Sequence, residues 1–157
     1  MQGRLEAINL SRGGVPKQPV FEALITDHGL SGDHQNDSHH HGGPDRAVVL
    51  YSLDVIRDLQ REGHPITVGA IGENLTVSGL DWHGVVPGTR LTVGGVALQI
   101  TKYATPCHNI RGFFLDNDFM RVYQERHPGW SRVCARVITG GIVRPGDAVT
   151  VESVHAM

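Results

Sequence analysis

The chain has 157 residues with 14 basic and 16 acidic side chains, which gives a formal net charge of −2. This near balance argues against a nucleic-acid-binding domain, because such domains ordinarily show a clear basic excess. The two cysteines are too few for a disulfide framework, or for an iron–sulfur cluster held by four thiolates. There is no apolar run of the roughly 20 residues that a membrane helix needs and no signal-peptide pattern, so we expect a cytoplasmic protein without a membrane partner.

Glycine is frequent, with 20 residues, whereas average usage would give about 11. These glycines separate short β-rich runs, a pattern typical of a barrel or sandwich with many tight turns. The sequence contains no internal repeat, linker or low-complexity segment. We therefore expect a single, mostly β domain over residues 1–157.

Short apolar runs bounded by glycine and proline predict about eight strands. They cover residues 3–10, 20–26, 47–51, 71–77, 89–93, 96–102, 131–139 and 147–151. Gly94 and Gly95 lie between two of these runs and predict a hairpin turn.

Two helices are predicted between the strands. The first begins at Ser52 as N-cap and ends at Gly63, which suits a C-terminal cap. The second begins after Asp116 or Asn117, either of which could cap it, and ends at residues 127–129.

Cys107 follows the strongest strand signal in the chain, residues 96–102. Because a proline cannot donate to a sheet ladder, we expect the strand to end by Pro106 and to leave Cys107 at the rim of the sheet. His108 and Arg111 lie just beyond it, and a thiolate near cationic groups is the form of cysteine that ligates metals. The alternative is that Cys107 is a small buried apolar residue, as free cysteines usually are.

Two glycine-rich loops carry cations that could contact an anion. The loop at residues 11–19 is either such a contact or a solvated hairpin connection. In the second loop, glycines precede Arg46, so backbone N–H groups could approach an anion closely and the guanidinium could bind a phosphate through two hydrogen bonds. Arg46 could equally form an ion pair with Asp33 or Asp45.

Glu73 and Asn74 place a carboxylate and an amide side by side before a predicted strand. Such a pair could bind the donor and acceptor edges of a heterocycle. The alternative is a turn in which Asn74 caps its own backbone, which is common for this residue type.

Four of the ten histidines lie close together; they are His34, His39, His40 and His41. Zinc sites use histidine, but this spacing does not match the helical H-E-x-x-H pair. A polar turn of this composition is also a common exposed loop.

Five segments, taken in order, resemble the MOSC domain, the family related to the C-terminal domain of molybdenum cofactor sulfurases. The matching segments are residues 29–34, 41–48, 72–75, 105–107 and 146–147. They span nearly the whole chain, and the early segment 13–17 resembles the small stand-alone bacterial members.

The resemblance implies a MOSC-like β-barrel with two or three short flanking helices. It also implies that Cys107 is the family's characteristic cysteine, which ligates molybdenum or carries sulfur. Members similar to this chain bind a molybdopterin-type molybdenum cofactor and reduce N-hydroxylated compounds such as hydroxylaminopurines. Cys134 departs from the pattern, since an aromatic or bulky residue is expected there.

From this resemblance we derive a hypothesis in which the Cys107 thiolate ligates molybdenum, because soft sulfur ligands suit such a centre. Glu73 and Asn74 contact the pterin ring or shape its pocket, and His108, or alternatively His34, donates the proton that turns the departing oxygen into water. Basic side chains must meet the cofactor phosphate. The candidates are Lys17, Arg46, Lys102 and Arg111.

The substrate in this hypothesis is a small N-hydroxylated molecule, and electrons must be resupplied after each turnover. Because the chain lacks a dinucleotide-binding G-x-G-x-x-G motif, we expect a separate reductase partner. Two alternatives stay open: a sulfur carrier that uses a Cys107 persulfide, and a non-enzymatic module that only binds the pterin cofactor. The sequence does not fix the oligomeric state.

Overall fold

The computed structural model describes residues 2–33 and 43–154. The cluster His34, His39, His40 and His41, considered above as a zinc site, lies outside these residues. Within the described ranges, no group of three or more metal-ligating side chains comes together.

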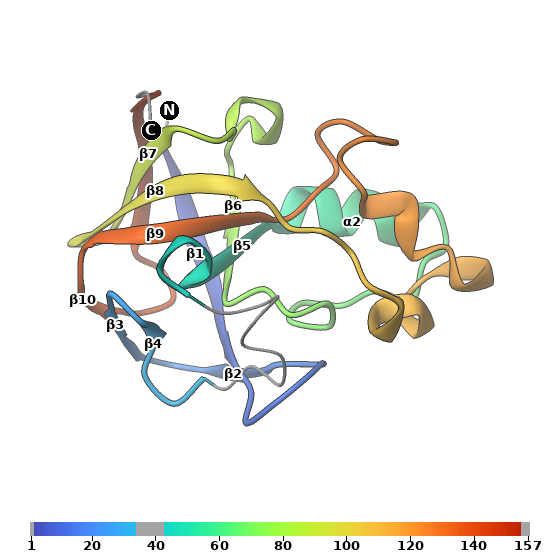
Figure 1. The fold of residues 1–157 in the computed structure, drawn as a ribbon, viewed down its shortest axis with the longest axis horizontal. Helices are drawn as coiled ribbons and strands as arrows, with labels where there is room; N and C mark the ends of the chain where they lie inside the picture. Colours follow the sequence, from blue (N-terminus) through green and yellow to red (C-terminus); the bar gives the residue numbers. More distant parts are fainter. Residues whose placement is uncertain (1, 34–42, 155–157) are drawn as a thin grey trace.

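Eleven strands form within the described residues, and seven of them close a mixed barrel (Figure 1). The barrel order is β1, β11, β7, β8, β9, β5 and β6, after which β6 pairs again with β1. Neighbours in this ring are antiparallel except for β5 and β6. The strands are β1 (Gln2–Leu10), β2 (Gln18–Val20), β3 (Ala23–Thr26), β4 (Gly29–Leu30), β5 (Val48–Ser52), β6 (Leu75–Ser78), β7 (Thr89–Val93), β8 (Val96–Tyr103), β9 (Val133–Thr139), β10 (Gly141–Val143) and β11 (Ala148–Val154).

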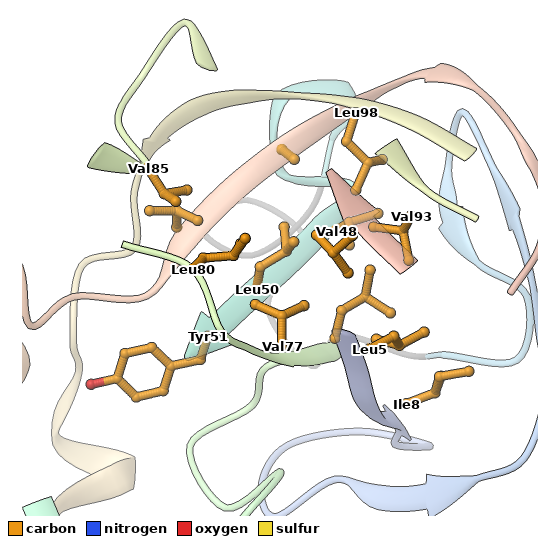
Figure 2. Close-up of a cluster of buried hydrophobic side chains, with 14 of the residues drawn as sticks. Leu5, Ile8, Val48, Leu50, Tyr51, Val77, Leu80, Val85, Val93 and Leu98 are labelled. Carbon is orange, nitrogen blue, oxygen red and sulfur yellow. The ribbon is translucent and has the colours of Figure 1, made fainter. Parts of the chain in front are cut away.

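The barrel interior holds the apolar core, because alternate residues of each strand point inward. In Figure 2 the side chains of Val48 and Leu50 from β5 gather with Leu5, Val77 and Leu98 from neighbouring strands. All five are fully buried. The neighbouring positions on the same strands therefore face out of the barrel, where covering segments can build a site.

Two covering segments pack against the outside of the wall. The 3-10 helix η1 (Pro44–Arg46) packs against β8 and β9, and the Thr101 hydroxyl donates a hydrogen bond to the Asp45 carbonyl. A small sheet in the order β10, β3, β4 lies at the lower left of Figure 1. The predicted strand 20–26 is divided between β2 and β3, with a bend at residue 21.

The helix α2 (Leu53–Arg61) forms as predicted from its caps. The Ser52 hydroxyl accepts a hydrogen bond from the Val55 N–H at 3.2 Å, and Gly63 follows the helix with a φ of +102°. Its apolar face, with Ile56 fully buried, lies against the core. In Figure 1 it stands at one end of the barrel, away from the chain termini.

The second predicted helix, from Asp116 or Asn117 to residues 127–129, does not form as an α-helix. Within that range only η5 (Phe119–Val122) is helical, as a short 3-10 helix. Two further 3-10 helices, η3 (His108–Phe113) and η4 (Leu115–Asn117), precede it. Asp116 and Asn117 have φ values of +55° and +56°, and this left-handed conformation separates η4 from η5 instead of capping a continuous helix.

The strand predicted from residue 71 begins only at Leu75, because the preceding residues form a turn that carries Glu73 and Asn74. The hairpin between β7 and β8 turns at Gly94 and Gly95 as predicted. Among the described residues there is no helix long and apolar enough to cross a membrane.

Gly29 allows β4 to approach the residue that follows η1. It has a φ of +108°, and a Cβ placed there would lie 2.3 Å from the Ala47 carbonyl oxygen. We predict that Gly29→Ala lowers the free energy of unfolding by about 2 kcal/mol or more, from strain and the close contact together. Urea denaturation followed by circular dichroism measures this change.

The matched control is Gly95→Ala, where a Cβ would meet nothing within 4 Å. This variant should stay within about 0.5 kcal/mol of the wild type. Equal stability of the two variants would contradict the packing described for β4 and η1.

Candidate functional site

Cys107 lies where the strand prediction placed it, beyond the end of β8 at Tyr103. Its thiol is free and partly exposed, and it donates a hydrogen bond to the Asn109 side-chain oxygen. Its carbonyl accepts from the Ile110 N–H at 3.2 Å, which fixes it at the start of η3. The thiol is therefore accessible and is not part of the apolar core.

A row of residues crosses the outer face of the barrel wall from β8 to β5. Lys102 on β8 is paired with Cys134 on β9, and Cys134 is paired with Val49 on β5. Asn74 lies beside Val49, whose N–H donates to the Asn74 side-chain oxygen at 3.0 Å. Because paired residues on neighbouring strands share a face, these side chains belong to one surface.

Cys134 is buried at the centre of this row, with 5% of its surface exposed. Burial raises the pKa of the Cys134 thiol, while the charges of Arg132, Arg46 and Lys102 act in the opposite direction. Three cations, from η1, from β8 and from the residue before β9, thus lie close enough to Cys134 to act on its pKa.

Asp33 is the polar centre at the Asn74 end of the row. One carboxylate oxygen accepts from the Lys17 ammonium at 2.7 Å and from the Asn74 amide at 2.9 Å. The other accepts from the Ser11 N–H at 2.9 Å. The side chains of Asp33 and Lys17 are only 5% and 6% exposed, so this is a buried ion pair that joins three segments of the chain.

Asn74 uses its whole amide to connect these segments. Besides Asp33 and Val49, it contacts the Asn9 carbonyl at 3.4 Å, and its own N–H and carbonyl bond to Val49 and Asn9. The alternative in which Asn74 caps its own backbone is wrong. Its place is structural support of the wall beside the site.

Glu73 points into the protein, with no exposed surface. One carboxyl oxygen accepts from the Gly69 N–H and from the Thr76 hydroxyl, each at 3.0 Å. The other oxygen has no partner among the described residues. Burial raises the pKa of Glu73 above its ordinary value of 4.5, and these hydrogen bonds only partly oppose the effect. Glu73 therefore shapes the turn, because none of its atoms is presented to a ligand.

Arg132 and Tyr51 extend the outer wall toward the Cys107 segment. Arg132 is 8% exposed and donates to the Ile71 carbonyl at 2.7 Å. Tyr51 is fully buried, and its hydroxyl donates to the Trp130 carbonyl at 2.5 Å. Figure 2 shows the Tyr51 ring on the side of β5 away from Leu50, and burial raises the pKa of its phenol.

The structure brings the predicted site residues together in three groups. Lys17 and Asn74 meet at Asp33, Arg46 and Lys102 both act to lower the pKa of Cys134, and His108 and Arg111 lie on η3, which begins directly after Cys107. Both η3 residues are exposed, and the Arg111 guanidinium donates to the His108 carbonyl at 2.9 Å.

Sequence reasoning missed the central place of Asp33 and the contribution of Arg132. In the sequence analysis Asp33 was considered only as a possible ion-pair partner of Arg46, although it lies in residues 29–34, one of the five segments that resemble the family. Arg132 gave no signal, because an arginine two residues before a buried cysteine is an ordinary strand pattern.

A cavity of about 390 Å³ opens beside this polar centre on the side of the β1–β2 loop. It is lined by Leu10, Ser11, Arg12, Pro16, Gln18 and Gly32. Its volume is within the range of small-molecule sites. Ser11 connects it to Asp33 through the backbone hydrogen bond described above.

The buried carboxyl of Glu73 predicts a pH dependence of stability. Because its pKa is raised in the folded protein, the folded state binds this proton more tightly than the unfolded chain does. The contribution to stability is complete below about pH 4.5 and is lost as the pH rises through the raised pKa. Glu73→Gln keeps an oxygen acceptor without a titrating group, so its free energy of unfolding should lack this decline.

Urea denaturation of both proteins over a pH series measures the difference between them. Parallel stability curves for the wild type and Glu73→Gln would contradict a buried, proton-binding Glu73.

The curated proteins that match this chain are similar to it over part of their length. Protein YiiM of Escherichia coli K12 is 31% identical over 114 residues, which are 69% of this chain and 51% of that protein. Protein YflK of Bacillus subtilis 168 is 30% identical over 136 residues, 85% of this chain and 60% of that protein. The chain thus spans between half and two thirds of these relatives. A protein named Reductase from Gibberella moniliformis is 30% identical over 138 residues, 84% of this chain but 23% of its own length.

Solved structures show the same fold. A crystal structure of a hypothetical protein has a TM-score of 0.76 at 26% identity and covers 98% of this chain and 69% of its own. The structure of YiiM from Escherichia coli has a TM-score of 0.72 at 24% identity, and the match covers 100% of this chain and 72% of that chain.

The family model for the MOSC domain matches residues 37–150. This range runs from before η1 through the Cys134 row and Cys107 to β11. The family resemblance and the barrel expected from it are therefore confirmed, and the chain belongs to the MOSC domain family.

Proposed function

We propose that this MOSC domain is a molybdenum-cofactor-dependent reductase of N-hydroxylated compounds, with Cys107 as the protein ligand to molybdenum. The observation that carries the proposal is an accessible thiol in the segment that follows β8, together with three cations that act on the buried Cys134 of the neighbouring strand. The domain family and the relative named Reductase, of which this domain makes up about a quarter, support the assignment.

The residues present fit such a cofactor by their chemistry. Cys107 offers a thiol that is neither paired in a disulfide nor sealed in the core, and thiolates are soft ligands suited to a metal of this kind. Arg46, Lys102 and Arg132 supply positive charge for a dianionic phosphate. Arg111 lies near the thiol on η3 and is exposed, so it is available to an anion that approaches from solvent.

Lys17, Glu73 and Asn74 have a different part in this proposal. The Lys17 ammonium is held by Asp33, and Glu73 and Asn74 are fully buried and hydrogen-bonded. They hold the wall and the adjoining loops in one geometry rather than meeting the cofactor with free donors. Their effect on binding is therefore to preorganise the pocket.

When bound, the molybdenum centre supplies two-electron chemistry that accepts oxygen from an N–O bond. The overall reaction takes an N-hydroxylated compound, two electrons and two protons to the amine and water. The protein must therefore deliver protons. His108 follows Cys107 directly and is exposed, so it can pass a proton to the departing oxygen and regain one from solvent.

Electrons come from a separate reductase in this proposal. The curated relative named Reductase, which is about four times as long as the matched region, is consistent with a MOSC domain that works beside another protein or domain. In this chain such a donor must approach the face that carries Cys107, because electron transfer requires closeness to the metal.

The ligand assignment predicts that Cys107→Ser abolishes molybdenum retention and reduction of N-hydroxylated substrates. The loss should exceed a hundredfold, as is typical when a metal ligand is removed rather than a supporting residue. Protein co-expressed with cofactor biosynthesis is assayed for molybdenum per chain and for turnover of a hydroxylaminopurine with an artificial reductant.

The control is Cys134→Ala, which removes the other thiol and should retain both molybdenum and activity. Full activity in Cys107→Ser would refute the assignment. A stoichiometric labile sulfur on Cys107 without molybdenum would instead favour a persulfide carrier, and tight cofactor binding without turnover would favour a pure binding module.

A further inference from the structure

His64 connects the segment that carries Cys107 to the C-terminal end of α2. Its ring is 8% exposed and lies at 5.4 Å from the Phe114 ring in an edge-to-face arrangement. The ring nitrogen Nδ1 is 3.0 Å from the Leu115 N–H, and Nε2 is 3.2 Å from a Glu62 carboxylate oxygen. Both ring nitrogens are therefore engaged, and on opposite sides.

These contacts fix the protonation state of the ring. Because a backbone N–H can only donate, Nδ1 must be an unprotonated acceptor for Leu115. The hydrogen of the neutral ring is then on Nε2, where it can be donated to Glu62. Protonation of His64 would place a second hydrogen on Nδ1 and face it toward the Leu115 N–H, which would lose its acceptor.

The charged groups described around the His64 ring, Glu62 and Arg121, lie on its Nε2 side. Glu62 lies against Nε2 and is itself held by Arg121 on η5 through two hydrogen bonds of 3.0 and 2.7 Å. Those hydrogen bonds hold the pKa of Glu62 below its ordinary value of 4.5, so it stays anionic in mild acid. From η3 and η4 the ring meets the Phe114 ring and the Leu115 N–H, and from α2 the Leu59 carbonyl accepts the His64 backbone N–H.

Leu115 is connected to Cys107 through η3. Phe114, the residue before Leu115, donates its N–H to the Arg111 carbonyl, and the Ile110 N–H bonds to Cys107. Ile110 and Phe114 are 2% and 3% exposed and anchor the segment in the core. The Leu115 side chain also packs against the turn before His64, where a Cβ on Gly63 would lie 3.1 Å from it.

We propose that His64 is a positioning residue for Cys107: with Nδ1 as the acceptor it holds Leu115, and with it η3, against α2. The consequence for catalysis rests on the proposed function, whereas the contact itself does not.

Two variants separate the functions of the two ring nitrogens. His64→Asn places an amide oxygen near the position of Nδ1, so it keeps the acceptor for Leu115. His64→Gln extends its amide toward the position of Nε2 and leaves Leu115 without that acceptor. Amide hydrogen exchange of Leu115, read by NMR as a protection factor, reports the contact without any need for bound cofactor.

In His64→Gln the Leu115 protection factor should fall by about three- to tenfold relative to the wild type, the equivalent of one hydrogen bond. In His64→Asn it should stay close to the wild-type value, because the acceptor is kept. The Lys17 N–H, which is bonded to the Gly69 carbonyl, is the internal control and should not change in either variant.

A wild-type Leu115 N–H without protection would overturn the proposal, even if no variant folds. So would an unchanged Leu115 protection factor in His64→Gln, or a fall of equal size in His64→Asn. If the cofactor-loaded enzyme is active, His64→Gln should also lose turnover that His64→Asn retains, and equal turnover in the two variants would overturn the positioning of Cys107. An inactive cofactor-loaded wild type would count against the proposed function, not against the contact.

Discussion

The buried carboxylate of Asp33 is the interaction on which the geometry of the site depends. It accepts hydrogen bonds from Lys17, Asn74 and the Ser11 backbone, and the two charged side chains are almost completely removed from water. A charge in such a place is tolerated only when it is paired and hydrogen-bonded, and loss of one partner costs about 3–5 kcal/mol. The β1–β2 loop and the turn before β6 are thus held against the barrel wall by one group.

The same strands carry the apolar core on one face and polar and charged side chains on the other. On β9, Val133 and Ala135 fill the barrel interior, and Cys134 between them lies outside among cations. This division follows from the two-residue period of a strand.

Sequence reasoning succeeded where local chemistry decides the structure. The Ser52 cap, the Gly94–Gly95 hairpin and the end of β8 before Pro106 each depend on residues that are neighbours in the chain. It was less accurate at Asp116, whose left-handed conformation depends on how the segment packs. The Asp33 centre and the His64 contact with Leu115 join residues far apart in sequence, so composition and spacing carry no sign of them.

The most direct test of this account is a double-mutant cycle between Asp33 and Lys17, with Asp33→Asn, Lys17→Met and the double variant compared by urea denaturation. A buried pair that organises the site predicts a coupling energy of at least about 1 kcal/mol. Each single variant should then lose more free energy of unfolding than the double variant does, because a single change leaves one buried charge without its partner. If the loss of unfolding free energy in the double variant equals the sum of the two single losses within about 0.5 kcal/mol, the two side chains act independently, and this result would contradict the account.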